Sequence, residues 1–81
     1  LALRAYTSSK PAQPHNFALS DREREILTWA ANGKSYVDIG LILNLSDHTV
    51  DFHMRKIFKK LEVNHTVLAV VKALTYGLIE P

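Results

Sequence analysis

The sequence predicts an all-α domain, a four-helix bundle with a helix-turn-helix motif, and three observations lead to that prediction. Apolar residues recur at helical spacing in four segments, and no segment alternates as a strand would. Three of these segments follow a serine, a residue type that caps helix N-termini. Only a very short turn separates the second segment from the third, which is typical of helix-turn-helix packing.

Composition limits the chain to one small domain. Its 81 residues allow one core, and a hydrophobic content of 47% excludes a disordered tail. The absence of cysteine excludes a disulfide framework and a thiolate zinc site. No apolar run approaches the roughly 18 residues of a membrane helix. We therefore expect no membrane partner and a cytoplasmic protein.

Residues 1–17 differ in composition from the rest of the chain. Two prolines and several small polar residues predict a linker, and Leu1-Ala2-Leu3-Arg4-Ala5-Tyr6 fits the end of an upstream helix. We expect residues 1–17 to be a linker or the end of a missing upstream domain, and residues 18–81 to form the folded domain.

The first helix has clear signals at both ends. Ser20 and Glu23 form the pattern of a capping box, in which each side chain bonds the other residue's amide. Asn32-Gly33 predicts the end of the helix, since glycine adopts the left-handed conformation easily. The inward face is expected to carry Ile26, Leu27 and Ala30.

The next two helices are separated by the turn at Asn44-Leu45. Ser35 caps the second helix, whose inner stripe is predicted to hold Ile39, Leu43 and part of Ile42. Ser46 caps the third helix, which is predicted to end near Leu61.

The third helix has two contrasting faces. At 100° per residue, the core face is predicted to carry Val50, Met54, Ile57 and Leu61. The opposite face carries His48, Asp51, Phe52, Arg55 and Lys59, with Lys56 and Lys60 at its margins. Arginine can bind guanine, aspartate can accept from cytosine and phenylalanine can contact the thymine methyl group. The marginal lysines suit phosphates.

A solvated face is the alternative interpretation, because Asp51 and Arg55 have the spacing of an ordinary helical ion pair. The net charge of +2 does not decide between the two. However, four basic residues and no acidic one lie between Arg55 and Lys60, and exposed Phe52 is unusual on a merely solvated face.

The fourth helix, from about His65 to Tyr76, is apolar almost all round. Small residues on one side fit an inward face. The other side carries Val67, Leu68, Val71 and Leu74, and such an exposed stripe usually marks an interface. We therefore predict a twofold homodimer through this helix.

The ordered motifs resemble the LuxR-type DNA-binding domain over about residues 18–79. The resemblance lies in Leu19-Ser20-x-Arg22-Glu23, Gly33-Lys34-Ser35, Asp38-Ile39, Leu45-Ser46-x-x-Thr49-Val50-x-Phe52-His53 and Lys60-Leu61-x-Val63. Trp29 and Phe52-His53 make the chain most similar to the quorum-sensing branch, whose members carry an N-terminal domain that binds an acyl-homoserine lactone.

The resemblance implies a regulator that binds a palindromic promoter site as a dimer, with the third helix in the major groove. It implies base contacts at the positions of Asp51, Phe52 and Arg55, beside which the helical face adds His48. It implies phosphate contacts at Lys34, Ser35, Thr49, Lys59 and Lys60, to which the helical face adds Lys56. No cofactor is expected in this domain, and RNA polymerase is a further candidate partner.

Three positions depart from the family pattern. Gly40 stands where the family usually has alanine, and Thr66 stands where arginine is common. Asp51 would bring an acidic side chain close to DNA, which would narrow the range of DNA sequences that the domain binds.

The four histidines show no zinc spacing and no catalytic partners, so neither a metal site nor an enzyme is expected. The output domain of a phosphorylated response regulator and a protein-interaction bundle remain alternatives.

Overall fold

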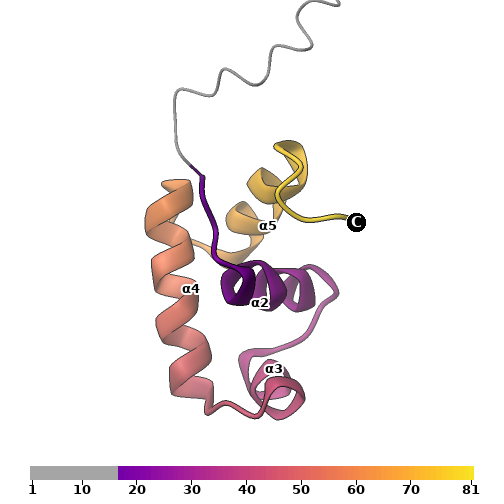
Figure 1. Ribbon diagram of the computed structural model, residues 1–81, viewed down its shortest axis with the longest axis vertical. Helices are drawn as coiled ribbons and strands as arrows, with labels where there is room; N and C mark the ends of the chain where they lie inside the picture. Colours follow the sequence, from indigo (N-terminus) through magenta and orange to yellow (C-terminus); the bar gives the residue numbers. More distant parts are fainter. Residues whose placement is uncertain (1–16) are drawn as a thin grey trace, which may run out of the picture.

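The computed structural model describes residues 17–81, which form four α-helices without a strand. The helices are α2 (Asp21–Ala31), α3 (Tyr36–Leu43), α4 (Asp47–Leu61) and α5 (Thr66–Thr75). In Figure 1, α4 stands upright at the left, α3 lies near its lower end and α5 near its upper end. Helix α2 packs against the other three helices. The all-α fold and its helix-turn-helix connection are confirmed, while residues 1–16 of the expected linker lie outside the described residues.

Side-chain caps begin all four helices. Ser20, Ser35 and Ser46 each accept a hydrogen bond from the amide three residues later, and the Ser20–Glu23 capping box is complete. His65 caps α5, where its Nδ1 atom accepts from the Val67 amide at 3.1 Å. Each bond satisfies one of the amides that a helix N-terminus leaves without a partner.

The core lies where α2, α4 and α5 meet. Val50, Met54, Ile57 and Leu61 are fully buried, as their helical spacing predicts. On α3, however, Ile42 is 42% exposed, so it is not part of the inner stripe. The buried neighbour of Ile39 is instead Gly40. Trp29 is partly buried and packs against the core.

The turn between α3 and α4 explains why glycine stands at position 40. Asn44 adopts the left-handed conformation with φ of 60°, and the Leu45 amide donates to the Gly40 carbonyl at 2.8 Å. The Leu45 carbonyl lies where a Cβ atom of residue 40 would be. The chain therefore packs this turn directly on the α3 backbone, a fit that an alanine would disturb.

The folded domain begins earlier than residue 18. Phe17 is 7% exposed and belongs to the core cluster, although the sequence placed it in the linker. Its ring lies 5.0 Å from that of Tyr76, and the Lys72 ammonium lies 5.2 Å from its centre. An aromatic residue with partners on a distant helix cannot be recognised from linker composition alone.

Candidate nucleic-acid interface

The outward face of α4 presents the side chains that the helical spacing predicts. His48, Arg55, Lys56 and Lys59 are exposed, Phe52 is 58% exposed and Asp51 is half-buried. The cause is local: four residues of the same helix are buried at its inward spacing, which turns these side chains outward. They therefore form one continuous surface on a single rigid helix.

Asp51 and Arg55 form an ion pair on this surface. Arg55 Nε donates to Asp51 Oδ2 at 2.8 Å, one helical turn apart. The hydrogen bond from Arg55 to Asp51, the Asp51 charge and the nearby Tyr36 together raise the pKa of Arg55 despite slight desolvation. The guanidinium is charged in any case, and the hydrogen bond to Asp51 ties its Nε atom to the preceding turn of α4.

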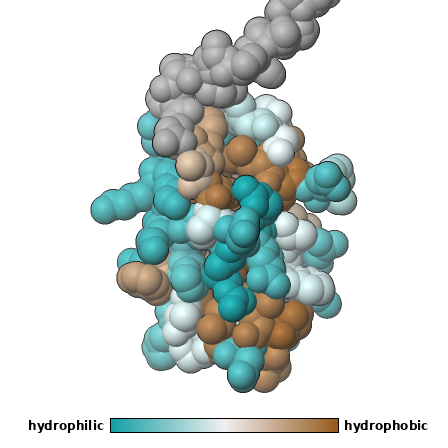
Figure 2. Space-filling model, in the orientation of Figure 1, coloured by the Kyte–Doolittle hydropathy of each residue, from teal (hydrophilic) through white to brown (hydrophobic). Residues whose placement is uncertain are grey.

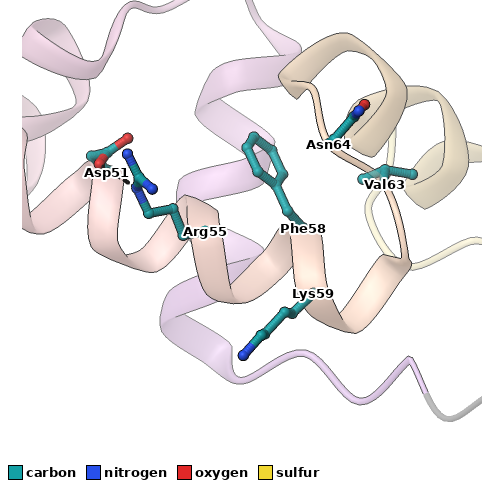
Figure 3. Close-up of a pocket in the computed structure, with 6 residues that line it drawn as sticks. All are labelled: Asp51, Arg55, Phe58, Lys59, Val63 and Asn64. Atoms are coloured by element: carbon teal, nitrogen blue, oxygen red, sulfur yellow. Dashed lines mark hydrogen bonds and ion pairs between the residues drawn. The ribbon is translucent and has the colours of Figure 1, made fainter.

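A pocket of ≈ 440 Å³ opens beside this pair. Figure 3 shows Asp51 and Arg55 facing each other, Lys59 directed away from them, and Phe58 between the pair and the loop before α5. The complete lining is Asp51, Arg55, Phe58, Lys59, Val63 and Asn64. The pocket therefore has one acidic and two basic side chains in its lining.

The exposed ring of Phe52 has contacts with its own helix. The Lys56 ammonium lies 5.3 Å from the ring centre, and the His53 ring lies 5.8 Å away at an angle of 64°. His53 is partly buried, and its Nδ1 atom is buried without a hydrogen-bond partner among the described residues. Phe52 is thus held in place although it projects into solvent.

Lys60 makes contacts that its helical position does not reveal. Its Nζ atom lies 2.7 Å from Glu23 Oε1 and 3.1 Å from the Ala18 carbonyl oxygen. The predicted contact between Lys60 and a phosphate would therefore compete with an ion pair to a buried carboxylate. Nothing local in the sequence links Lys60 to Glu23, because the two residues are 37 positions apart.

The beginning of α3 lies close to the beginning of α5. The Tyr36 hydroxyl and Thr66 Oγ1 are 2.9 Å apart and share a hydrogen bond. Lys34 and Ser35 are exposed just before α3. Thr49 Oγ1 accepts from the Ser46 hydroxyl at 3.0 Å. Tyr36 was not among the predicted site residues. Thr66, which stands where the family commonly has arginine, is its hydrogen-bond partner.

The exposed side of α5 carries the predicted apolar stripe. Val67 is 60% exposed, Leu68 50%, Val71 54% and Leu74 38%. Figure 2 shows hydrophobic surface near the α5 end of the molecule and near the α3 end, with hydrophilic surface between them. The four stripe residues belong to α5, whereas the polar face described above belongs to α4.

Residues 17–81 have neither a cluster of metal ligands nor a helix that could span a membrane. They contain no group of three or more histidine, aspartate or glutamate side chains that could hold a metal ion. None of their helices has both the length and the apolar character needed to cross a membrane.

Comparison with known sequences gives a consistent answer. The family model described as "Bacterial regulatory proteins, luxR family" matches residues 18–73. The quorum-sensing regulator RhlR of Pseudomonas aeruginosa is 49% identical over 61 residues, which are 75% of this chain and 25% of RhlR. The quorum sensing-dependent regulator RpaR of Rhodopseudomonas palustris is 44% identical over 77 residues, 95% of this chain and 31% of RpaR.

Solved structures show the same fold. Escherichia coli SdiA has a TM-score of 0.79 at 31% identity, over 95% of this chain and 32% of SdiA. The response regulator ChrA of a heme-sensing two-component system has a TM-score of 0.75 at 32% identity, over 95% of this chain and 37% of ChrA. The chain spans between 25% and 37% of the length of these relatives. From its sequence and its fold alike, the chain belongs to the luxR family of bacterial regulatory proteins, as a DNA-binding domain of the helix-turn-helix type.

Proposed function

We propose that this domain recognises a specific promoter sequence by inserting α4 into the major groove of double-stranded DNA. The observation that supports this proposal is the outward face of α4, which combines Arg55, Asp51, Phe52 and His48 on one rigid helix. These side chains supply a bidentate donor, an acceptor, an apolar contact and a further polar group for base edges. Among these residues, Arg55 is the one that we expect to bind a guanine.

The flanks of this face hold the DNA backbone. Lys56 and Lys59 are exposed beside it, while Lys34, Ser35 and Thr49 lie at the starts of α3 and α4. Helix N-termini and lysines are favourable partners for phosphates and fix the register without reading sequence. Lys60 can contact a phosphate only if its ammonium group leaves Glu23. We therefore expect Lys60 to make the weakest of these contacts with the DNA backbone.

A homodimer would place two copies of α4 on a palindromic site. The apolar stripe of α5, made of Val67, Leu68, Val71 and Leu74, is exposed and belongs to a different helix from the proposed DNA-binding face. Burial of this stripe against its own copy would create an isologous twofold interface. Twofold symmetry of the protein then requires two inverted half-sites in the DNA.

The regulator that contains this domain is proposed to act in quorum sensing. RhlR and RpaR are named as quorum-sensing regulators, and SdiA has been solved with octanoyl-rac-glycerol. An acyl-homoserine lactone would then bind in a separate N-terminal domain, and RNA polymerase would be the partner of the DNA-bound protein. The similarity to ChrA keeps a response regulator as the second candidate, because both kinds of protein share this output fold.

Selection of bound sites from random DNA tests the core of the proposal. The wild-type chain should enrich one sequence, and its affinity should fall steeply with salt. Arg55→Ala should lower specific affinity by about 1–3 kcal/mol and relax preference at one base pair. A protein-interaction bundle would enrich nothing, and unchanged base preference in Arg55→Ala would remove that residue from the reading face.

A further inference from the structure

The Asp51–Arg55 ion pair uses only the Nε atom of the Arg55 guanidinium. The bond runs from Nε of Arg55 to Oδ2 of Asp51, and both side chains are substantially exposed. No hydrogen bond within residues 17–81 involves the terminal Nη1 and Nη2 groups of Arg55. These two groups are the ones that can donate side by side to O6 and N7 of a guanine.

We propose that Asp51 is a specificity-determining residue that acts by positioning Arg55. This inference rests on the proposed function, because it assumes that Arg55 reads a guanine. Asp51 holds Nε from the preceding turn of α4, so the terminal nitrogens project beyond the pair. A long side chain normally loses rotamer freedom when it binds. Here the ion pair restricts Arg55 before DNA arrives, and less freedom remains to be lost on binding.

The charge of Asp51 matters as much as its geometry. A carboxylate beside a phosphate backbone lowers the affinity for any DNA, since like charges repel. On non-cognate DNA this repulsion persists, and Arg55 remains bonded to Asp51 instead of neutralising a phosphate. At a guanine, O6 and N7 of the base accept hydrogen bonds from the guanidinium that Asp51 has already oriented. The pair therefore lowers non-specific binding more than specific binding, and so widens the difference between the two.

The test measures the base preference of the 81-residue chain at the base pair that Arg55→Ala relaxes. Dissociation constants are compared for the selected site, for the site with that guanine replaced, and for unrelated DNA across a salt series. Asp51→Ala should reduce the guanine preference about three- to tenfold, a part of the roughly five- to 150-fold that a bidentate contact provides. It should tighten binding to unrelated DNA and steepen the salt slope there by up to ~0.9, because Arg55 becomes available to one more phosphate.

Asp47→Ala is the matched control. Asp47 is an exposed acid in the first turn of the same helix and has no ion-pair partner among residues 17–81. Its removal should tighten binding to all DNA without changing the guanine preference. If both variants act alike, Asp51 contributes only bulk charge and the proposal fails.

A double-mutant cycle with Arg55→Ala tests whether Asp51 acts through Arg55. In the Arg55→Ala background, Asp51→Ala should leave preference at that base pair unchanged. A persisting effect would mean that Asp51 acts on this base pair without Arg55, through the direct base contact of the proposed function alone, and would overturn the positioning role. Failure of Arg55→Ala to relax any base pair would instead overturn the proposed function, so the two failures are distinguishable.

Discussion

Lys60 Nζ lies 2.7 Å from Glu23 Oε1 and joins the end of helix α4 to a carboxylate buried on α2. Burial raises the pKa of Glu23, but hydrogen bonds from Lys60 and the Ser20 amide lower it. The charges of Lys60 and Lys56 add to that effect, so the pKa lies below the ordinary value of 4.5. Glu23 therefore links the capping of α2 to the packing of α4.

The first prediction concerns stability against acid. Because the folded pKa of Glu23 is depressed, its contribution is fully present above about pH 4.5 and is lost as the pH falls through the folded pKa. Glu23→Gln should therefore be less stable than wild type at pH 7, and the difference should shrink below pH 4.5. Urea unfolding from pH 7 to pH 3 measures it. A constant difference would show that the ion pair contributes nothing.

The second prediction separates Lys60 from its neighbour Lys59. Lys60→Ala leaves the buried Glu23 carboxylate without its cation, which should reduce the free energy of unfolding by about 1–3 kcal/mol. Lys59→Ala should leave thermal melting unchanged, weaken binding to all DNA sequences and reduce the salt slope by ~1. Melting curves and gel shifts on both variants test this. Equal melting temperatures would contradict the structural role of Lys60.

The third prediction concerns the turn of the helix-turn-helix motif. Gly40→Ala should improve the helix propensity of α3 by ~1 kcal/mol. The added Cβ would nevertheless meet the Leu45 carbonyl, which cannot move without shifting the turn. We expect a net destabilisation of about 1–3 kcal/mol, as in other overpacked sites. Chemical unfolding measures whether the free energy of unfolding falls or rises. A more stable variant would show that the turn can shift at little cost and would contradict the prediction.

The fourth prediction tests the dimer. Val71→Glu should reduce cooperative binding to a site with two inverted half-sites, while binding to one half-site remains. Leu41→Glu on α3 is the matched control, because Leu41 is 77% exposed and lies outside the stripe. It should bind both DNAs like wild type. If Val71→Glu unfolds the domain, the stripe belongs to the core and the dimer proposal fails.

Helix positions, caps and the inward face of α4 could all be predicted from the sequence, because each depends on residues within a few positions of one another. Ser20 meets Glu23 across one turn, and Val50 shares a face with Met54 by periodicity alone. The same local reasoning identified the possible pair of Asp51 with Arg55, which the structure confirms.

Contacts between distant segments could not be predicted in this way. Lys60 and Glu23 are 37 positions apart, and Tyr36 and Thr66 are 30 apart, so no spacing rule connects them. The inward side of α3 likewise includes a contact that helical spacing does not reveal, the close approach of the Leu45 carbonyl to Gly40. The DNA and dimer contacts stay predictions, because they depend on partners outside the chain.

The packing of Phe17 determines how a mechanical load from upstream enters the domain. Phe17 meets Tyr76 and Lys72, so the entering chain is clamped to the end of α5. A displacement of Phe17 would therefore act directly on α5, the helix with the exposed apolar stripe. The same entering segment also contacts α4, through the hydrogen bond from Lys60 to the Ala18 carbonyl. A shift of Phe17 and Ala18 would thus be felt at the end of α5 and at the end of α4 alike.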